Sequence, residues 1–216
     1  MDQPTEISPA LESAISDLLL RNPAIIEAGK RAFSEDFFLP DLFVAAVLNR
    51  ALQLLHGFVA LVRNRNYLSA TPLYRLQLDN GLRLWAAHLV ESFDVFTSEV
   101  LNGKRIDKMK SKNGERLTDH HLITSLAAYL QLPKLPMAYN YASGFVHLSG
   151  HHIFATHRIE NEGKLLSRIV RLDETTDDAK WLDLIEGFSS ATDVVLTLVN
   201  AWAGQKNEER LKRDKA

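Results

Sequence analysis

The chain has 216 residues, of which 46% are hydrophobic and 24% charged, and these values are typical of a globular domain. Its 25 basic and 27 acidic residues give a net charge of −2, which excludes a polycation that binds nucleic acid through bulk charge. Because the chain has no cysteine, disulfides, thiolate nucleophiles, zinc ribbons and iron–sulfur clusters are excluded as well. Arginine, histidine, tyrosine and aspartate are left to carry any chemistry.

No targeting signal is predicted at the start of the chain. The first twenty residues carry acids where a signal or transit peptide carries bases. The most apolar segment, residues 39–62, is interrupted by the polar side chains Asp41, Asn49, Arg50, Gln53 and His56. This pattern is typical of a buried helix in a soluble protein, so we expect a cytoplasmic protein without membrane contact.

The first half of the chain predicts four helices. Ser8 caps a helix over 8–20 with Pro9 at its first position, and Asn22-Pro23 opens a second helix to about residue 33. Pro40-Asp41 opens a long helix to about residue 66, whose apolar residues recur at spacings of three and four. A further helix begins at Ser69–Pro72 and runs to about residue 96. The short connection predicts that these two long helices pack antiparallel.

The second half of the chain predicts helices that are separated by loops and a small hairpin. A polar, basic loop covers 103–116, Thr118-Asp119 caps a helix over 119–131, and a further helix spans 137–149 and ends near Gly150. Residues 151–172 predict a small β-hairpin around the turn 160–163. After an acidic linker, a helix over 177–204 precedes a frayed tail, 205–216. We therefore predict one all-α domain, with N-terminal helices in 1–38 and core helices in 40–150.

The first candidate site is a charged face on the helix that begins near Ser69. Arg75, Asp79 and Arg83 are four residues apart and therefore share one face. Arg50, on the preceding long helix, is placed to face them. Arginine suits a partly buried, planar arrangement of several hydrogen bonds. The face is predicted to be either an ion network that fixes helix register or an arginine-lined site for an anion or phosphate.

The second candidate is a polar stripe on the helix 137–149. Tyr139, Ser143 and His147 follow one another at four-residue spacing, so a phenol, a hydroxyl and an imidazole share one face. The imidazole is either a general acid–base or a core histidine bonded to a backbone carbonyl. We predict no metal site and no cofactor, because Gly150 separates His147 from His151 and no HExxH-type carboxylate accompanies them.

Three weaker candidates complete the set. Arg83 and His88 have the spacing of a phosphate-binding arginine and a proton-transferring histidine. In the basic loop, Lys108, Lys110 and Lys112 are either solvated or in contact with a phosphate or a partner. A small-molecule pocket between helices, anchored by Arg75 and lined by aromatic residues, is a third interpretation. Its aromatic residues would be Phe58, Tyr74, Trp85 and Phe145.

The paired long helices and the later Tyr139…Ser143…His147 element resemble an uncharacterised bacterial family related to the HEPN helical domains. The resemblance covers roughly 45–150 and rests on Arg50, Tyr67, Arg75 and Asp79 together with that element. It implies a homodimeric bundle acting as a metal-independent ribonuclease or toxin in bacterial defence or toxin–antitoxin systems. Its implied catalytic residues are His147, Arg75, Tyr139 and Ser143.

The sequence departs from the active HEPN pattern, which places an Arg shortly before the late histidine. Asn140, Tyr141 and Ala142 occupy those positions here. An arginine from another helix, Arg75 or Arg50, would have to complete a site with His147. Two functions therefore stay open at this point: a ribonuclease acting on RNA, and a non-enzymatic helical module that binds a protein partner and uses the Arg, Asp and His residues as a buried network.

Overall fold

The computed structural model describes residues 7–33, 37–159, 164–170, 172–173 and 176–213, and helices dominate them, as the sequence predicts. The elements are α1 (Pro9–Leu19), α2 (Arg21–Ala32), α3 (Leu39–Arg63), α4 (Tyr67–Leu89), α5 (Phe93–Leu101), the 3₁₀ turn η1 (Ile106–Lys108), α6 (Asp119–Tyr129), α7 (Leu135–Ser143), α8 (Gly150–Thr156), β1 (His157–Ile159), β2 (Leu165–Ser167) and α9 (Asp178–Arg213).

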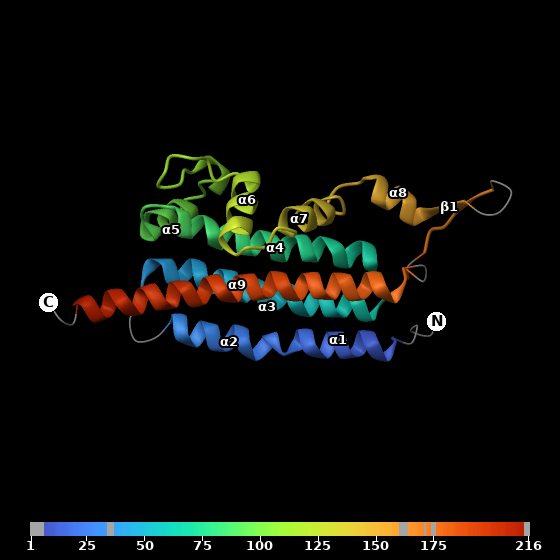
Figure 1. The fold of residues 1–216 in the computed structure, drawn as a ribbon, viewed down its shortest axis with the longest axis horizontal. Helices are drawn as coiled ribbons and strands as arrows, with labels where there is room; N and C mark the ends of the chain where they lie inside the picture. Colours follow the sequence, from blue (N-terminus) through green and yellow to red (C-terminus); the bar gives the residue numbers. More distant parts are fainter. Residues whose placement is uncertain (1–6, 34–36, 160–163, 171, 174–175, 214–216) are drawn as a thin grey trace.

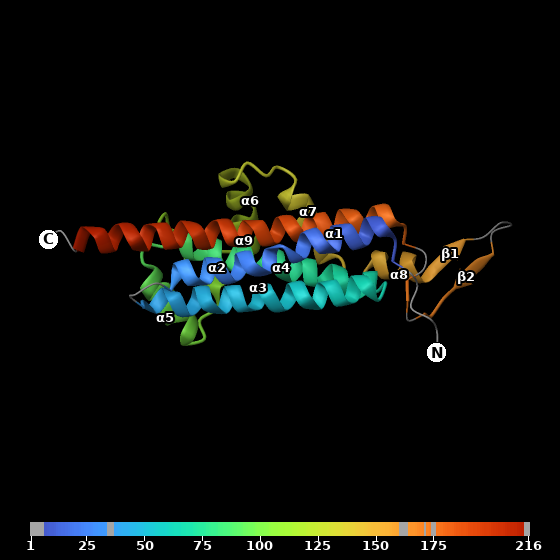
Figure 2. The ribbon, with the colours of Figure 1, turned by 90° about the horizontal axis from the view of Figure 1, so that it is seen from below.

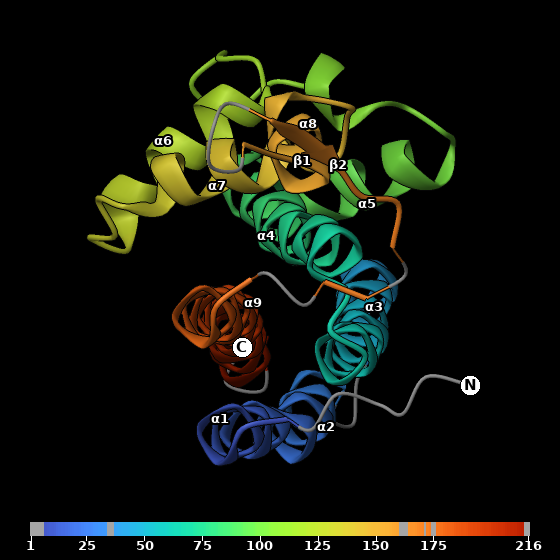
Figure 3. The same ribbon diagram turned by 90° about the vertical axis from the view of Figure 1, so that its right-hand side faces the viewer.

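The bundle is built from α3, α4 and α9 together with α1 and α2, which follow each other end to end (Figures 2 and 3). The predicted antiparallel pair is confirmed, since α4 returns alongside α3 after the short turn at Arg65, which has a φ of 48°. In the core between these helices, Phe58 of α3 stacks on Phe188 of α9 with ring centroids 4.2 Å apart.

Helices α4 and α9 lie side by side and run in the same direction (Figure 1). Two parallel neighbours need a long connection, because the chain must return to the end from which it started. The connection here holds α5 to α8 and the strands, and α6 and α7 pack on the outer side of α4. This outer layer places side chains from α6 and α7 over the charged face of α4.

Several helix boundaries differ from the prediction. Helix α4 begins at Tyr67 because the Asn66 side chain accepts from Ser69 N at 3.1 Å, and Pro72 therefore lies inside the helix. It ends at Leu89, and α5 follows as a separate helix capped by Ser92, whose side chain accepts from Val95 N at 3.2 Å. The single helix predicted to run to about residue 96 is therefore wrong, since its last residues belong to α5.

The predicted frayed tail is helical as far as Arg213. Lys206 anchors this end of α9 to the bundle. Its Nζ donates to Asp41 Oδ2 at 2.6 Å and to the Ala32 carbonyl at 2.8 Å. Trp202 Nε1 donates to the other oxygen of the same carboxylate at 3.0 Å. All three polar side chains are buried, so this end of α9 is part of the core.

The region 151–172 is partly the predicted hairpin. Strands β1 and β2 pair antiparallel, with Arg158 opposite Leu166, while the predicted turn 160–163 lies outside the described residues. Residues 151–156 are helical instead of extended. Ser149 caps that helix, its side chain accepting from His151 N at 3.3 Å, so Gly150 begins α8 and does not end a helix over 137–149.

Helix α3 is the one described helix long and apolar enough to span a membrane by length and composition. One side of it is buried in the bundle, including Val44, Leu55 and Phe58. Its exposed side carries Asn49, Gln53 and His56. The exposed side also carries Leu39 and Leu42 near the start of the helix, so α3 packs one apolar face in the bundle and leaves a mixed face outside.

Candidate functional site

The charged face of α4 is confirmed, and it is the centre of an ion network. Arg83 Nη2 donates to Asp79 Oδ1 at 2.7 Å, and Arg75 Nη1 lies 3.6 Å from the same oxygen. From α3, Arg50 Nη1 reaches Asp79 Oδ2 at 3.5 Å. Three arginines therefore surround one carboxylate whose side chain is only 17% exposed.

Asp119 at the start of α6 is the second carboxylate of the network. Its Oδ1 accepts from Arg83 Nη2 at 2.6 Å, and its Oδ2 accepts from the Tyr139 hydroxyl at 2.7 Å. Sequence reasoning assigned Asp119 only to a helix cap. The one signal that could have drawn attention to it is an acidic side chain in the first turn of a helix that follows a basic loop.

Arg75 joins α4 to α7. Its Nε donates to Ser143 Oγ at 2.9 Å, and its Nη2 donates to the Tyr139 hydroxyl. The guanidinium also lies over the Tyr139 ring, 3.7 Å from the centroid, where the negative face of the ring attracts the cation. Arg75, Tyr139 and Ser143 are thus brought together as predicted, and Arg75 is largely buried by these contacts.

The electrostatics of the network fix the proton positions at neutral pH. Burial raises the pKa of Asp119, but the Tyr139 hydrogen bond and the charges of Arg83 and Arg75 outweigh it and hold the pKa below the ordinary value. Burial, together with the hydrogen bond to Asp119, raises the pKa of Tyr139. The carboxylate stays ionised and the phenol stays protonated.

His147 does not join the network, contrary to the predicted stripe. Helix α7 ends at Ser143, and the next residues turn so that Phe145 is buried and stacks on the His151 ring at 4.7 Å. His147 therefore lies beyond the helix with an exposed side chain. It makes no hydrogen bond or ion pair to any other residue in the described part of the chain. The Tyr139–Ser143 half of the stripe is correct and the histidine is not part of it.

The Arg83–His88 pair is separated by the helix itself. Five residues rotate the side chain by about 140° around an α-helix, so the two point to different sides. Arg83 faces α6, whereas His88 Nε2 donates to the Leu198 carbonyl of α9 at 3.1 Å. Burial lowers the pKa of His88, which keeps its imidazole neutral. These two residues do not form a phosphate-cleaving pair.

The basic loop is ordered and partly neutralised. Met109 and Leu117 anchor it in the core, and Lys110 forms a β-bridge with Arg116. Lys108 Nζ lies 3.9 Å from Asp107, while Lys110 and Lys112 are exposed, apart from the arginine network. Between loop and network lies an open cleft of about 480 Å³. It is lined by Arg83, Arg105, Ile106, Asp107, Thr118 and Asp119.

The four aromatic residues predicted to line a small-molecule pocket do not lie around one cavity. Phe58 packs on Phe188 in the bundle core, and Trp85 stacks on Tyr129 of α6 at 4.7 Å. The Tyr74 ring lies against Gly187, and a Cβ added there would come within 2.9 Å of it. Phe145 packs against Tyr67 and His151 at the end of α7. Each ring fills a different part of the core.

Comparisons with protein-family models, with curated proteins and with solved structures find no match to this chain. The resemblance to HEPN domains therefore stays a prediction from the residues quoted above.

Proposed function

We propose that this chain is a non-enzymatic helical binding module of the cytoplasm, in which the Arg–Asp–Tyr network is structural. The observation that carries the proposal is the shared Asp119 carboxylate, which binds Arg83 of α4 through one oxygen and Tyr139 of α7 through the other. Together with Arg75, it ties three helices into one layer. A network of this kind fixes which helices pack together and in what register.

The charges of the network are largely satisfied within the protein. Its three arginines face two carboxylates, and the two most buried arginines, Arg75 and Arg83, each contact both of them. A substrate phosphate would have to displace these aspartates from guanidinium groups that are already hydrogen-bonded. Phosphate-cleaving sites instead direct unpaired donors at the position where charge develops.

The network also lacks a group that exchanges a proton near neutral pH. Tyr139 has a raised pKa and Asp119 a lowered one, while His88 and His147 lie elsewhere. General acid–base catalysis needs a group with a pKa near the working pH within reach of the substrate. These positions favour a structural role over RNA cleavage.

A metal-independent ribonuclease is the second candidate, favoured by the open cleft where Arg83 and Arg105 meet beside the basic loop. Both candidates are tested by incubating the purified chain with labelled RNA in EDTA, alongside Arg105→Met, which changes the lining of the cleft, and His147→Ala, which lies outside it. We expect no cleavage above a buffer control from any of the three proteins. EDTA-resistant cleavage by the wild type that Arg105→Met abolishes would overturn the non-enzymatic proposal.

A further inference from the structure

Part of the basic loop, residues 109–117, folds into a short hairpin, which we call the loop hairpin. Leu117 N donates to the Met109 carbonyl at 3.1 Å, and Ser111 N donates to the Glu115 carbonyl at 2.8 Å. The side chains of Met109, Ser111 and Leu117 are buried, so one face of the hairpin packs on the rest of the protein. The other face is directed to solvent.

The outer face of the loop hairpin sets two cations against each other. Lys110 and Arg116 are bridge partners, and the two backbone hydrogen bonds lie on either side of them. They form the cross-strand pair without hydrogen bonds of its own, in which the Cα atoms are about 4.5 Å apart and the side chains are closest. Like charges in that position destabilise a hairpin. A locally unfavourable pair of this kind is typical of a functional site.

Two further lysines lie beside this pair. Lys108 and Lys112 are each two residues from Lys110 and exposed, while the residues between them are buried, so the three lysines share the outer face. Lys108 and Lys112 are also the diagonal neighbours of Arg116 across the hairpin, a relation that places side chains about 7–8 Å apart. We call these four residues the cation face.

The carboxylates of the basic loop do not neutralise the cation face. Asp107 contacts Arg105 at 2.8 Å and approaches Lys108 only to 3.9 Å, and Glu115 reaches His121 of α6 at 3.3 Å. In the part of the chain that the structure describes, no carboxylate contacts the other three members of the cation face. Their charges are therefore available to an anion from outside the chain.

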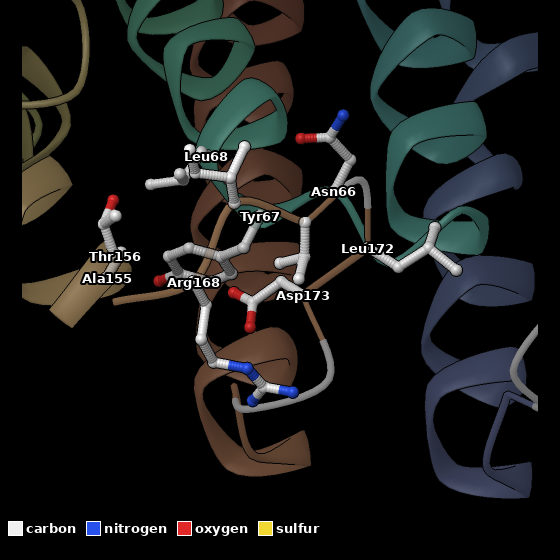
Figure 4. Close-up of a pocket in the computed structure, with 10 residues that line it drawn as sticks. Asn66, Tyr67, Leu68, Ala155, Thr156, Arg168, Leu172 and Asp173 are labelled. Carbon is white, nitrogen blue, oxygen red and sulfur yellow. The ribbon is translucent and has the colours of Figure 1, made fainter. Parts of the chain in front are cut away.

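The pocket at the opposite end of α4 has no such excess of charge. It has a volume of about 230 Å³ and lies between Tyr67 at the start of α4 and Thr156 at the end of α8 (Figure 4). Arg168 and Asp173 both line it, so a cation and an anion border the same space. That pocket gives no preference for a charged ligand, whereas the cation face selects an anion.

We propose that the cation face binds an extended acidic peptide of a partner protein. The proposal rests on the proposed role of the chain as a binding module and names the class of its partner. Side chains two residues apart on an extended chain are about 6.5–7 Å apart, so a peptide with acids at alternate positions repeats at about the spacing of Lys110 and Lys112. A carboxylate placed between Lys110 and Arg116 also removes their repulsion and accepts charge-assisted hydrogen bonds from both.

Nucleic acid fits the cation face less well. Backbone binding to a duplex draws on about six to ten phosphate contacts. The cation face offers fewer basic side chains than that, namely Lys108, Lys110, Lys112 and Arg116. Proteins that bind single strands also stack the bases on aromatic side chains, and residues 103–118 include no aromatic residue.

The charge of the remaining chain also favours a small ligand. Residues 104–116 hold six basic and two acidic side chains, an excess of four, while the whole chain has a net charge of −2, so the other residues together carry −6. A long duplex or an anionic bilayer is repelled by that charge, whereas a short peptide contacts the cation face alone. Within the described stretch 103–118, no large apolar side chain is exposed for insertion into a bilayer.

Fluorescence anisotropy with the full chain tests the proposal. The probe is a labelled peptide in which glutamate and serine alternate, and the same peptide with glutamine in place of glutamate is its control. We expect the wild type to bind only the acidic probe, with a Kd below about 100 μM at low salt, and Lys110→Gln/Arg116→Gln to weaken binding by about tenfold or more. Lys134→Gln/Lys180→Gln is the matched control and should bind as the wild type does, because it removes the same charge from exposed side chains outside the loop.

Three results would overturn the proposal. One is no binding of the acidic probe by the wild type at about 100 μM, and another is an equal loss of binding in both double variants. The third is tighter binding of an oligonucleotide or of phosphatidylserine vesicles than of the peptide, which would assign the cation face to nucleic acid or to a membrane. Whether the chain is an enzyme is decided separately by the RNA cleavage assay, whatever the peptide result.

Thermal unfolding tests the like-charged pair and shows that the variants fold. Because Lys110 and Arg116 repel each other, Arg116→Gln is expected to melt at or above the wild-type temperature while it weakens probe binding. A melting temperature lowered by more than about 2 °C would mean that the pair stabilises the loop hairpin, and the reasoning would then fail.

Discussion

Replacing Arg83 with methionine is expected to destabilise the protein more than replacing Arg75. Arg83 makes the two shortest ion pairs of the network, 2.7 Å to Asp79 and 2.6 Å to Asp119. Arg75 lies at 3.6 and 3.4 Å from the same carboxylates. The sequence alone suggests that Arg75→Met strands Asp79 as a buried charge, but the structure leaves Asp79 with Arg83 and Arg50.

The magnitude follows from burial. The Arg83–Asp79 hydrogen bond, between side chains 23% and 17% exposed, is worth about 1.5–3 kcal/mol. The Arg83–Asp119 pair is discounted to about 0.5–1 kcal/mol, because the Asp119 side chain is 40% exposed. We therefore expect Arg83→Met to lower the free energy of unfolding by about 2–4 kcal/mol. Arg75→Met loses its hydrogen bonds to Ser143 and Tyr139, but each hydroxyl keeps its other partner, the Tyr139 carbonyl and Asp119 respectively. Because neither hydroxyl is left without a partner, we expect about 0.5–1 kcal/mol for each bond and about 1–2 kcal/mol in all.

Urea unfolding followed by circular dichroism measures these differences, and thermal melts should show a fall of about 2–4 °C for each kcal/mol. Arg63→Met is the control, since its 2.5 Å contact with Glu12 joins two side chains nearly half exposed and should be worth less than about 1 kcal/mol. If Arg83→Met destabilises no more than Arg63→Met, the network does not hold α6 and α7 to α4. If Arg75→Met has the larger effect, the centre of the network has been misassigned.

Two further substitutions test the carboxylates Asp119 and Asp41. The lowered pKa of Asp119 means that its ionised form stabilises the fold above the unfolded pKa near 3.8 and that this stabilisation is lost as the pH falls through the folded value. The difference in unfolding free energy between wild type and Asp119→Asn should therefore be largest at neutral pH and shrink below about pH 4, and a constant difference in urea titrations would contradict the pKa shift. Lys206→Met should lose about 3 kcal/mol because Asp41 remains buried without a counter-ion, and the double variant Asp41→Asn/Lys206→Met should recover part of that loss in the same assay.

Much of the secondary structure could be predicted because its causes are local. Ser8 and Thr118 cap their helices as expected, each side chain accepting a backbone N–H three residues later at 3.3 Å. Spacings of four residues correctly placed Arg75, Asp79 and Arg83 on one face, since helix geometry alone sets that relation. The tail after residue 204 was mispredicted because its helix depends on Lys206 reaching Asp41, far away in the chain.

In the candidate site, too, local helix geometry could be predicted and contacts between distant segments could not. The four-residue spacing that groups Arg75 and Asp79 also suggested His147, but that spacing holds only while the helix continues, and burial of Phe145 ends it. The only local signal for Asp119 is its place in the first turn of α6, and that signal does not show its partners, because its role arises from α6 packing across α4. The sequence by itself determined which side chains share a helix face, since each turn fixes its own geometry. Only the tertiary structure decided which faces meet, because that depends on burying apolar surface over the whole bundle.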